Sequence, residues 1–241
     1  MTSLDAAFDT PDAKRRHVRR LFATIADRYD LITALLSFGR DRVWKRRLID
    51  LSGAAKGERV LDLACGTGDI AFEAAGRGAR VTGLDITLRM VELARQKGAN
   101  RATFLVGDMH ALPMAPASFD VVTTGYGLRN VPDLPAALRE IHRVLAPGGR
   151  LCSLDFDRPP HAVMRRIFLA YLTVVGSTLG WILHRDPDTY RYIPASIRRY
   201  PGAAGVVKLM TDAGFADARA LRVFGGFMAI HLARKPGLPW R

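Results

Sequence analysis

The sequence predicts an α/β fold: a doubly wound, mostly parallel sheet of seven strands, with N-terminal helices before it and a helical cap inserted into it. Three observations predict this fold. Short apolar runs bounded by turn residues alternate with amphipathic stretches, the first run leads into a glycine-rich turn, and the alternation stops near residue 158. Buried parallel strands have continuous apolar sequences, and strands that alternate with helices form parallel sheets.

The N-terminal segment, residues 1–52, is predicted to be helical. Between residues 14 and 51, apolar side chains recur at steps of three and four, the spacing of an amphipathic helix. This stripe comprises Leu21, Phe22, Ile25, Tyr29, Ile32, Leu35 and Leu36. Residues 37–39 interrupt the pattern, so a second, short helix is expected from Val43 to Leu51.

The central part of the chain alternates between the two kinds of element. Strands are expected at 60–64, 80–85, 102–106, 119–124 and 150–156, and helices at 70–77, 88–97 and 134–145. In such a sheet the strands share one carboxyl edge, and ligands bind in the crevice outside it.

After residue 158 the pattern changes. Helices are expected at 162–184, 188–200 and 203–213, and two closing strands at 218–223 and 227–233. The α/β domain is therefore assigned to residues 53–158 and 202–235, the cap to 159–201, and a tail to 236–241. Insertions at the carboxyl edge of an open sheet bind substrates, so the cap is predicted to form a substrate site.

Composition narrows the class of protein. The 241 residues carry a formal net charge of +13, which favours an acidic partner such as nucleic acid, an anionic membrane or a phosphorylated ligand. The two cysteines exclude a disulfide framework and a cysteine-rich zinc site. The N-terminus has no apolar signal region, so a cytoplasmic protein is expected.

The first strand leads into a turn suited to a nucleotide. Gly66 and Gly68 let the backbone pass close to a ligand, and the following helix offers free N–H groups. Asp85 ends the next strand, where a carboxylate can accept two hydrogen bonds from a ribose diol. A glycine turn without a ligand is the alternative, and residues 66–71 also satisfy the G-x-G-x-x-G/A dinucleotide pattern.

Three features favour S-adenosylmethionine over NAD. Asp62 and Asp69 place acids at the turn, which suits the ammonium and sulfonium groups and repels a diphosphate. Asp108 follows the third strand, where an acid can accept from an adenine amino group. The segments 119–122 and 143–150 have the spacing of strands four and five. Cys65 has no adjacent histidine, so it is interpreted as a small packed residue.

With these residues in view, the chain resembles the ubiquinone/menaquinone-biosynthesis C-methyltransferase family of class I S-adenosylmethionine-dependent methyltransferases over about residues 18–235. The matching segments are 22–31 (FATIADRYDL), 36–39 (LSFG) with Trp44-Lys45, 62–69 (DLACGTGD), 111–113 (ALP), 127–131 (GLRNV), 190–192 (YRY) with Ser196-Ile197, and 229–231 (AIH). The GLRN and RYD segments are the most specific, and their co-occurrence carries the resemblance.

The resemblance implies a set of cofactor contacts. Thr67 with Gly66 and Gly68 would hold the methionine moiety, Asp85 the ribose, and Asp108 with Met109 the adenine. Asp62 and Gly125 complete the implied set. The chain also departs from the family: Gly125 stands where serine is common, Thr33 where asparagine is usual, and Asp155 where glutamate is usual.

The resemblance further implies methyl transfer to a ring carbon of a prenylated hydroquinone, either demethylmenaquinol or the benzoquinol precursor of ubiquinone. A cation near the ring oxygen would stabilise a phenolate and make the ring carbon more nucleophilic. Arg129 is assigned this role, or that of positioning a water that removes the proton, with Asn130 orienting it. The alternative is that Arg129 pairs with a carboxylate and Asn130 caps the next helix.

Other polar residues keep two interpretations each. Tyr192 and Ser196 in the cap either hold ring oxygens or pack. Tyr29 either closes over the cofactor or packs in the core. His231 is either a base or, as its place in a strand favours, a structural hydrogen-bond partner. No two of the six histidines are spaced as a metal-binding pair on a helix, so no metal is expected.

An uncharged apolar segment, residues 167–183, raises the question of a membrane. Its length is at the short limit for a span, and Gly176 and Gly180 weaken that interpretation. A buried cap helix that walls a prenyl tail is favoured, with arginines on both flanks that suit anionic headgroups. The expected protein is a cytoplasmic enzyme that contacts an anionic membrane peripherally.

Rival functions stay open at this stage. A methyltransferase of another small lipid or secondary metabolite is the leading alternative, and an NAD-dependent enzyme is a further one. The basic cluster at residues 14–20 suggests nucleic acid, but the sequence has no aromatic ribonucleoprotein motif or recognition helix, so no nucleic-acid partner is expected. A homodimer is a candidate assembly.

Overall fold

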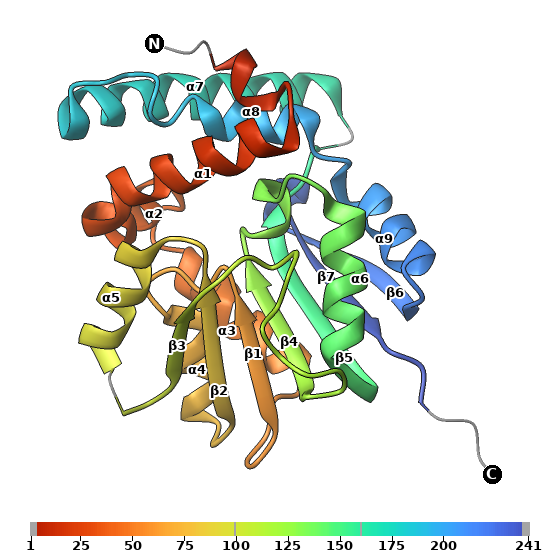
Figure 1. The fold of residues 1–241 in the computed structure, drawn as a ribbon. Coiled ribbons are helices and arrows are strands. Elements are labelled where there is room, and N and C mark those ends of the chain that lie inside the picture. Colours follow the sequence, from red (N-terminus) through yellow and green to blue (C-terminus); the bar gives the residue numbers. More distant parts are fainter. Residues whose placement is uncertain (1–3, 99, 160, 238–241) are drawn as a thin grey trace.

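The computed structural model describes residues 4–98, 100–159 and 161–237, and they form one seven-stranded sheet covered by helices (Figure 1). The strands are β1 (Arg59–Leu63), β2 (Arg80–Asp85), β3 (Thr103–Val106), β4 (Phe119–Gly125), β5 (Leu145–Phe156), β6 (Ala216–Val223) and β7 (Met228–Arg234). Their order is β3-β2-β1-β4-β5-β7-β6, and β7 alone runs antiparallel to its neighbours among them.

Within the described part of the chain, three α-helices precede the first strand, three alternate with the strands, and three follow one another after β5. They are α1 (Pro11–Ile25), α2 (Tyr29–Leu36), α3 (Asp41–Ser52), α4 (Asp69–Gly76), α5 (Leu88–Gly98), α6 (Leu134–Val144), α7 (Ala162–His184), α8 (Tyr192–Arg199) and α9 (Gly202–Asp212). Short 3-10 segments are η1 (Asp5–Phe8), η2 (Ala26–Arg28), η3 (Leu128–Asn130) and η4 (Phe224–Gly226).

The doubly wound sheet with its predicted strands and helices is confirmed. Several boundaries differ from the prediction. A 3-10 turn at η2 separates α1 from α2, and α8 begins at Tyr192 rather than at residue 188. β5 begins at Leu145 rather than at residue 150, because Leu145 already pairs with Phe119 before a bulge in the ladder. The last four residues of the predicted tail, 238–241, lie outside the described residues.

Two hydrophobic cores lie on the two faces of the sheet. On one face, α3, α4 and α5 pack through residues such as Leu48, Ala71 and Val91. On the other, α6 and α9 pack through residues such as Leu138 and Met210. Cys65 is buried in the first core, as its interpretation as a packed residue required. The central strands β1 and β4 are therefore covered on both sides, which explains their continuous apolar sequences.

The remaining helices lie over the carboxyl ends of the strands. α1, α2, α7 and α8 sit together above that edge (Figure 1), and α2 and α8 both pack against α7. The strand order reverses between β1 and β4, which opens a crevice at this edge of the sheet. The N-terminal segment and the cap thus roof the same crevice, although they are distant in the sequence.

One face of α7 packs against the protein. Phe168, Leu172, Gly176 and Gly180 form a buried stripe at every fourth residue. The glycines allow a close approach, because a Cβ at Gly180 would lie 2.5 Å from the carbonyl oxygen of Asp186.

The opposite face of α7 is exposed, so the prediction of a buried cap helix was wrong for that face. Val163, Ile167, Val174 and Trp181 project from it and are each more than half exposed. Successive residues of a helix turn by about 100°, which places these four side chains opposite the buried stripe. Within the described residues, α7 is the one helix whose length and apolar composition alone would suffice to cross a membrane.

Candidate active site

Two cavities lie side by side at the carboxyl edge of the sheet. The first, the sheet-edge cavity, has about 680 Å³ of empty space, part of it open to solvent, above β1, β2 and β4. The second, the apolar cavity, has about 840 Å³ of such space between α2, α7, α8 and the end of β5. Three aromatic residues line both: Phe22, Tyr29 and Tyr126. These three are called the shared wall below.

The glycine turn forms the floor of the sheet-edge cavity. Gly68 has φ +91° at the start of α4, and a Cβ there would lie 2.9 Å from the ring of Phe72. This position therefore accepts only glycine. Gly66 lines the cavity, and its N–H donates to Asp85 Oδ2 at 2.9 Å. Thr67 is not among the lining residues; its hydroxyl donates to Asp30 of α2 at 2.6 Å.

Asp85 is placed as the sequence predicted. It ends β2, is 7% exposed and lines the cavity. The N–H groups of Gly66 and Thr87 fix its two oxygens, at 2.9 and 2.8 Å. Burial raises the pKa of Asp85, and these donors oppose the rise. Each oxygen keeps further acceptor capacity for a ribose hydroxyl.

Asp108 and Met109 also line the sheet-edge cavity, after β3. His110 donates its backbone N–H to Asp108 Oδ1 at 2.9 Å, and its ring nitrogen lies 2.7 Å from the same oxygen. These hydrogen bonds lower the pKa of Asp108 to about 2. Arg15 of α1 pairs with Asp108 Oδ2 at 2.9 Å, so α1 is tied down over the cavity.

The two acids predicted at the turn, Asp62 and Asp69, lie in different surroundings. Asp62 is fully buried on β1 and does not line the cavity; Thr123 donates to its Oδ1 at 2.8 Å, while Oδ2 has no partner. Burial raises the pKa of Asp62 to about 7. Asp69 lies outside the cavity lining and pairs with Lys45 and Lys97, so its predicted contribution to charge selection was wrong.

Gly125 lies at the end of β4 and lines the sheet-edge cavity. A Cβ at this position would lie 2.5 Å from Ile70 Cδ1. The serine that is common in the resembled family would therefore require Ile70 to move. Glycine here is explained by packing against α4 as well as by closeness to the cavity.

Arg129 and Asn130 lie next to each other in η3 but face different cavities. Arg129 lines the apolar cavity and Asn130 the sheet-edge cavity. The amide of Asn130 donates to the carbonyl oxygen of Tyr126 at 2.8 Å, and its Oδ1 has no partner. The alternative that Asn130 caps the next helix was wrong, because Asp133 caps α6 by accepting from Ala136 N at 2.9 Å.

Arg129 does pair with a carboxylate, as its alternative interpretation required. Its backbone N–H donates to Asp155 Oδ2 at 3.0 Å and its Nε to Oδ1 at 3.3 Å. Its Nη1 donates to the hydroxyl of Ser196. The guanidinium lies 5.2 Å from the ring centre of Phe156. The charge is thus balanced, and the side chain is fixed at the wall of the apolar cavity.

The two cap residues are only partly brought to a cavity. Tyr192 lines the apolar cavity, is 1% exposed, and its hydroxyl has no partner among the residues that the structure describes. Ser196 is not among the lining residues; it lies behind Arg129 and holds it. His231 lies 3.2 Å from the hydroxyl of Ser153, and burial lowers its pKa to about 4, which agrees with a structural role.

Sequence reasoning missed several residues of the site. The ammonium of Lys14, from the cluster interpreted as basic surface, donates to the carbonyl oxygens of Arg129 (3.1 Å) and Val131 (2.6 Å), and burial lowers its pKa to about 8. Tyr126 in the shared wall was also missed. Its position just after strand four, beside two glycines, was the available signal.

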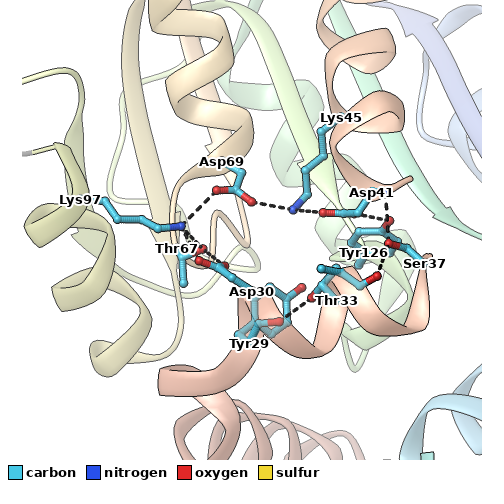
Figure 2. Close-up of polar contacts among 11 residues, drawn as sticks. Tyr29, Asp30, Thr33, Ser37, Asp41, Lys45, Thr67, Asp69, Lys97 and Tyr126 are labelled. Atoms are coloured by element: carbon cyan, nitrogen blue, oxygen red, sulfur yellow. Dashed lines mark hydrogen bonds and ion pairs between the residues drawn. The ribbon is translucent and has the colours of Figure 1, made fainter. Parts of the chain in front are cut away.

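A polar network joins the N-terminal helices to the glycine turn (Figure 2). Tyr126 donates to Asp41 at 2.7 Å, Lys45 bridges Asp41 (2.5 Å) and Asp69 (3.0 Å), and Lys97 bridges Asp69 and Asp30. The network connects the shared wall to the loop around Thr67. It therefore couples the position of α2 and α3 to the floor of the sheet-edge cavity.

The sheet-edge cavity fits S-adenosylmethionine. The ligand's ammonium needs acceptors, and the buried Asn130 Oδ1, on a residue that lines this cavity, has no partner in the described part of the chain. Asp85 and Asp108 present carboxylates where the ribose and the adenine amino group are expected. Within the described residues, no group of three or more His, Cys, Asp or Glu side chains could hold a metal.

Solved structures of methyltransferases share this fold. An S-adenosylmethionine-dependent methyltransferase of Thermotoga maritima, described as a possible histamine N-methyltransferase, superposes with a TM-score of 0.66 at 19% identity and covers 90% of this chain and 99% of that one. Haemonchus contortus phosphoethanolamine N-methyltransferase 2, solved with S-adenosylmethionine, superposes with a TM-score of 0.61 at 16% identity. The match covers 80% of this chain and 52% of that one. These likenesses show that the chain has the fold of class I S-adenosylmethionine-dependent methyltransferases.

Curated relatives narrow the class. Demethylmenaquinone methyltransferase of Thermus thermophilus is 41% identical over 221 residues, 90% of this chain and all of the relative. Ubiquinone/menaquinone biosynthesis C-methyltransferase UbiE of a Shewanella strain is 37% identical over 232 residues, 93% of this chain and 92% of the relative. The family model for the ubiE/COQ5 methyltransferase family matches residues 10–235. The chain belongs to this family.

Proposed function

We propose that the protein transfers a methyl group from S-adenosylmethionine to a ring carbon of a prenylated hydroquinone in respiratory quinone biosynthesis. One observation carries the proposal: an apolar cavity of about 840 Å³ shares a wall with the cavity that fits the methyl donor. An aromatic ring with an apolar tail fits the second cavity, and its reacting carbon would meet the methyl group at the shared wall. The names of the relatives support this substrate class over other small lipids.

The chain's own residues would bind and orient the two ligands. Gly66, Asp85 and Asp108 would hold the donor from the sheet side, while Phe22 and Tyr29 close the cavity from above. When bound, S-adenosylmethionine supplies a methyl group on a positively charged sulfur, which is already activated. The protein therefore has to align the two reacting atoms and exclude water.

Arg129 would make the ring carbon more nucleophilic. Its guanidinium lines the apolar cavity and can stabilise negative charge on a ring oxygen. Asp155 and Ser196 fix the guanidinium, so little side-chain freedom is lost when the ring binds. Asn130 would fix the turn through its bond to the Tyr126 carbonyl. Tyr192 would meet a ring oxygen or the first part of the tail.

The test uses purified protein, S-adenosylmethionine, and short-tailed demethylmenaquinol or the benzoquinol precursor of ubiquinone. Mass spectrometry is expected to show a product heavier by one methylene. R129A is expected to lower turnover about 100-fold, as removal of one stabilising donor does, with donor affinity unchanged. Arg139, exposed on α6, gives the control R139A. If wild-type protein methylates neither quinol, the substrate class is wrong; near-normal turnover of R129A would remove Arg129 from the mechanism.

We also propose that the outer face of α2 and α7 contacts an anionic membrane. Leu31, Leu35 and Phe38 are exposed beside the exposed apolar face of α7. Phe38 stacks on Tyr171 of α7 with ring centres 5.8 Å apart. Exposed arginines flank this face at Arg166 and Arg185. Apolar patches of this kind, rimmed by positive charge, suit an anionic bilayer. The apolar cavity lies directly behind them, so a lipid-borne substrate would have a short path.

Flotation with lipid vesicles tests this contact. The protein is expected to float with phosphatidylcholine vesicles that contain phosphatidylglycerol, and less with phosphatidylcholine alone. The double variant V174Q/W181Q is expected to stay at the bottom of the gradient. Leu88, exposed on α5 away from this face, gives the matched control L88Q. Absence of flotation at low salt would contradict the proposal.

Two further expectations about partners remain predictions: that the protein binds no nucleic acid, and that it forms a homodimer.

A further inference from the structure

Tyr126 occupies an unusual position in the shared wall. It follows β4 with φ +60°, a left-handed conformation that non-glycine residues seldom adopt. Its backbone N–H donates to Leu154 O at 2.7 Å, and its carbonyl oxygen accepts from Asn130 at 2.8 Å. Both backbone groups are therefore fixed, and the surrounding structure holds the strained residue in place. Its ring is 9% exposed and lines both cavities.

The hydroxyl of Tyr126 has a defined proton direction. It lies 2.7 Å from Asp41 Oδ1, and the other oxygen of Asp41 pairs with Lys45 at 2.5 Å (Figure 2). Asp41 is 5% exposed and Lys45 is 8% exposed. A lysine ammonium can only donate, and the carboxylate that pairs with it can only accept. The phenolic proton of Tyr126 must therefore point at Asp41.

Electrostatics keeps that proton in place. Burial and the adjacent Asp41 carboxylate raise the pKa of Tyr126 well above its ordinary value. Burial alone would lower the pKa of Lys45, but Asp41, Tyr29 and Asp69 together outweigh burial and raise it. Neither group changes its charge near neutral pH. A hydroxyl that has committed its single proton to Asp41 has only acceptor capacity left.

We propose that Tyr126, held as a hydrogen-bond acceptor by the Asp41–Lys45 pair, makes the apolar cavity select the reduced hydroquinone over the oxidised quinone. This inference rests on the proposed function. A hydroquinone presents an O–H that can donate to Tyr126. The corresponding quinone presents a carbonyl, so two acceptors would face each other in a buried site, and neither would be satisfied. Tyr126 is thus a specificity residue, and Asp41 and Lys45 are positioning residues.

Binding measurements test the selection without relying on turnover. Short-tailed demethylmenaquinol and demethylmenaquinone are titrated, anaerobically and aerobically, into protein saturated with S-adenosylhomocysteine. Wild-type protein is expected to prefer the hydroquinone. Y126F keeps the ring but lacks the oxygen, and its preference is expected to fall about tenfold, which corresponds to roughly one buried hydrogen bond. A general loss of stability would weaken both ligands and leave the ratio unchanged.

D41N provides a second, directional readout. Lys45 can only donate, so it binds the amide oxygen of the new side chain and turns the amide nitrogen toward Tyr126. The Tyr126 oxygen then accepts from that nitrogen, and its proton becomes free to donate into the cavity. The ratio of affinities for hydroquinone and quinone is therefore expected to shift toward the quinone, and to shift further in D41N than in Y126F. Rotation of the hydroxyl is the only change required.

The control variant is Y171F, because Tyr171 is a half-buried tyrosine of α7 that stacks on Phe38 and does not line the apolar cavity. It is expected to keep the wild-type preference. If wild-type protein methylates the hydroquinone and Y126F keeps the wild-type ratio of affinities, the inference is wrong while the proposed function stands. If wild-type protein neither binds nor methylates either ligand, the proposed function fails first.

Discussion

The two cavities of this protein are built in different ways. The sheet-edge cavity takes its polar groups from strand ends and from the turns that follow them, at Gly66, Asp85 and Asp108. The apolar cavity is assembled from helices and loops distant in the sequence, with contributions from Ile32, Leu172 and Phe227. A strand end fixes a polar group by local geometry. A cavity between helices depends on how whole elements pack, so its chemistry is not visible in any one segment.

The polar side chains of the two cavities also differ in how they are satisfied. In the sheet-edge cavity, Asn130 Oδ1 has no partner among the described residues and can meet a ligand donor. In the apolar cavity, Arg129 is held by Asp155 and Tyr126 by Asp41, although the hydroxyl of Tyr192 also lacks a partner in the described part of the chain. The first site thus offers a free acceptor to a cofactor, whereas the second holds most of its polar side chains in its own network. The comparison implies that substitutions in the two cavities separate donor binding from substrate binding.

The largest expected effect breaks the first cavity alone. D85A would remove the two charge-assisted hydrogen bonds that we propose to the ribose, each of which contributes about 1.5–3 kcal/mol, so S-adenosylhomocysteine should bind at least about 100-fold more weakly. Isothermal titration calorimetry measures this affinity. D120A is the matched control, because Asp120 lies near the start of β4, at the opposite end of the strands, and pairs with Arg59 at 2.7 Å. A change below about threefold in D85A would show that Asp85 does not bind the donor.

An intermediate effect separates the two cavities. Leu172 is 2% exposed and lines the apolar cavity, so L172A should lower the free energy of unfolding by about 2–4 kcal/mol. Donor affinity should change less than about twofold, because Leu172 does not reach the sheet-edge cavity. Chemical denaturation and calorimetry measure the two quantities. Equal losses in both would mean that the cavities form one cooperative site.

The smallest effect concerns the helix that covers the sheet-edge cavity. The ion pair between Arg15 and Asp108 joins side chains that are 38% and 28% exposed, so R15A should lower the free energy of unfolding by at most about 1 kcal/mol. Because the pair holds α1 over the cavity, R15A should also speed release of the methyl donor a few-fold. Stopped-flow displacement measures the rate, with R19A on the exposed face of α1 as control. An unchanged release rate would show that α1 does not limit exchange.

The pH dependence of that effect is also defined. The hydrogen bond from His110 holds the pKa of Asp108 at about 2, below its value of about 3.9 in an unfolded chain. Its contribution to stability is therefore present above about pH 4 and is lost as the pH falls toward 2. The difference between R15A and wild-type protein should accordingly be constant from about pH 5 upward.

Much of the fold could be predicted because it depends on local pattern. The apolar run before Gly66, the carboxylate that ends β2 and the alternation of elements lead directly to the sheet and to the residues at its edge. Asp85, Asp108 and Met109 line the cavity as predicted. Asp69 was misplaced because its own partners, Lys45 and Lys97, come from helices whose positions the sequence does not reveal.

By itself, the sequence determined where strands and helices form and which acids stand at the strand ends, because backbone hydrogen bonding and apolar periodicity act over a few residues. Only the tertiary structure decided that α7 leaves one apolar face exposed, that Lys14 points inward, and that Tyr126 meets Asp41. Those outcomes depend on contacts between segments far apart in the chain, and on how buried charges find their partners when the helices close over the sheet.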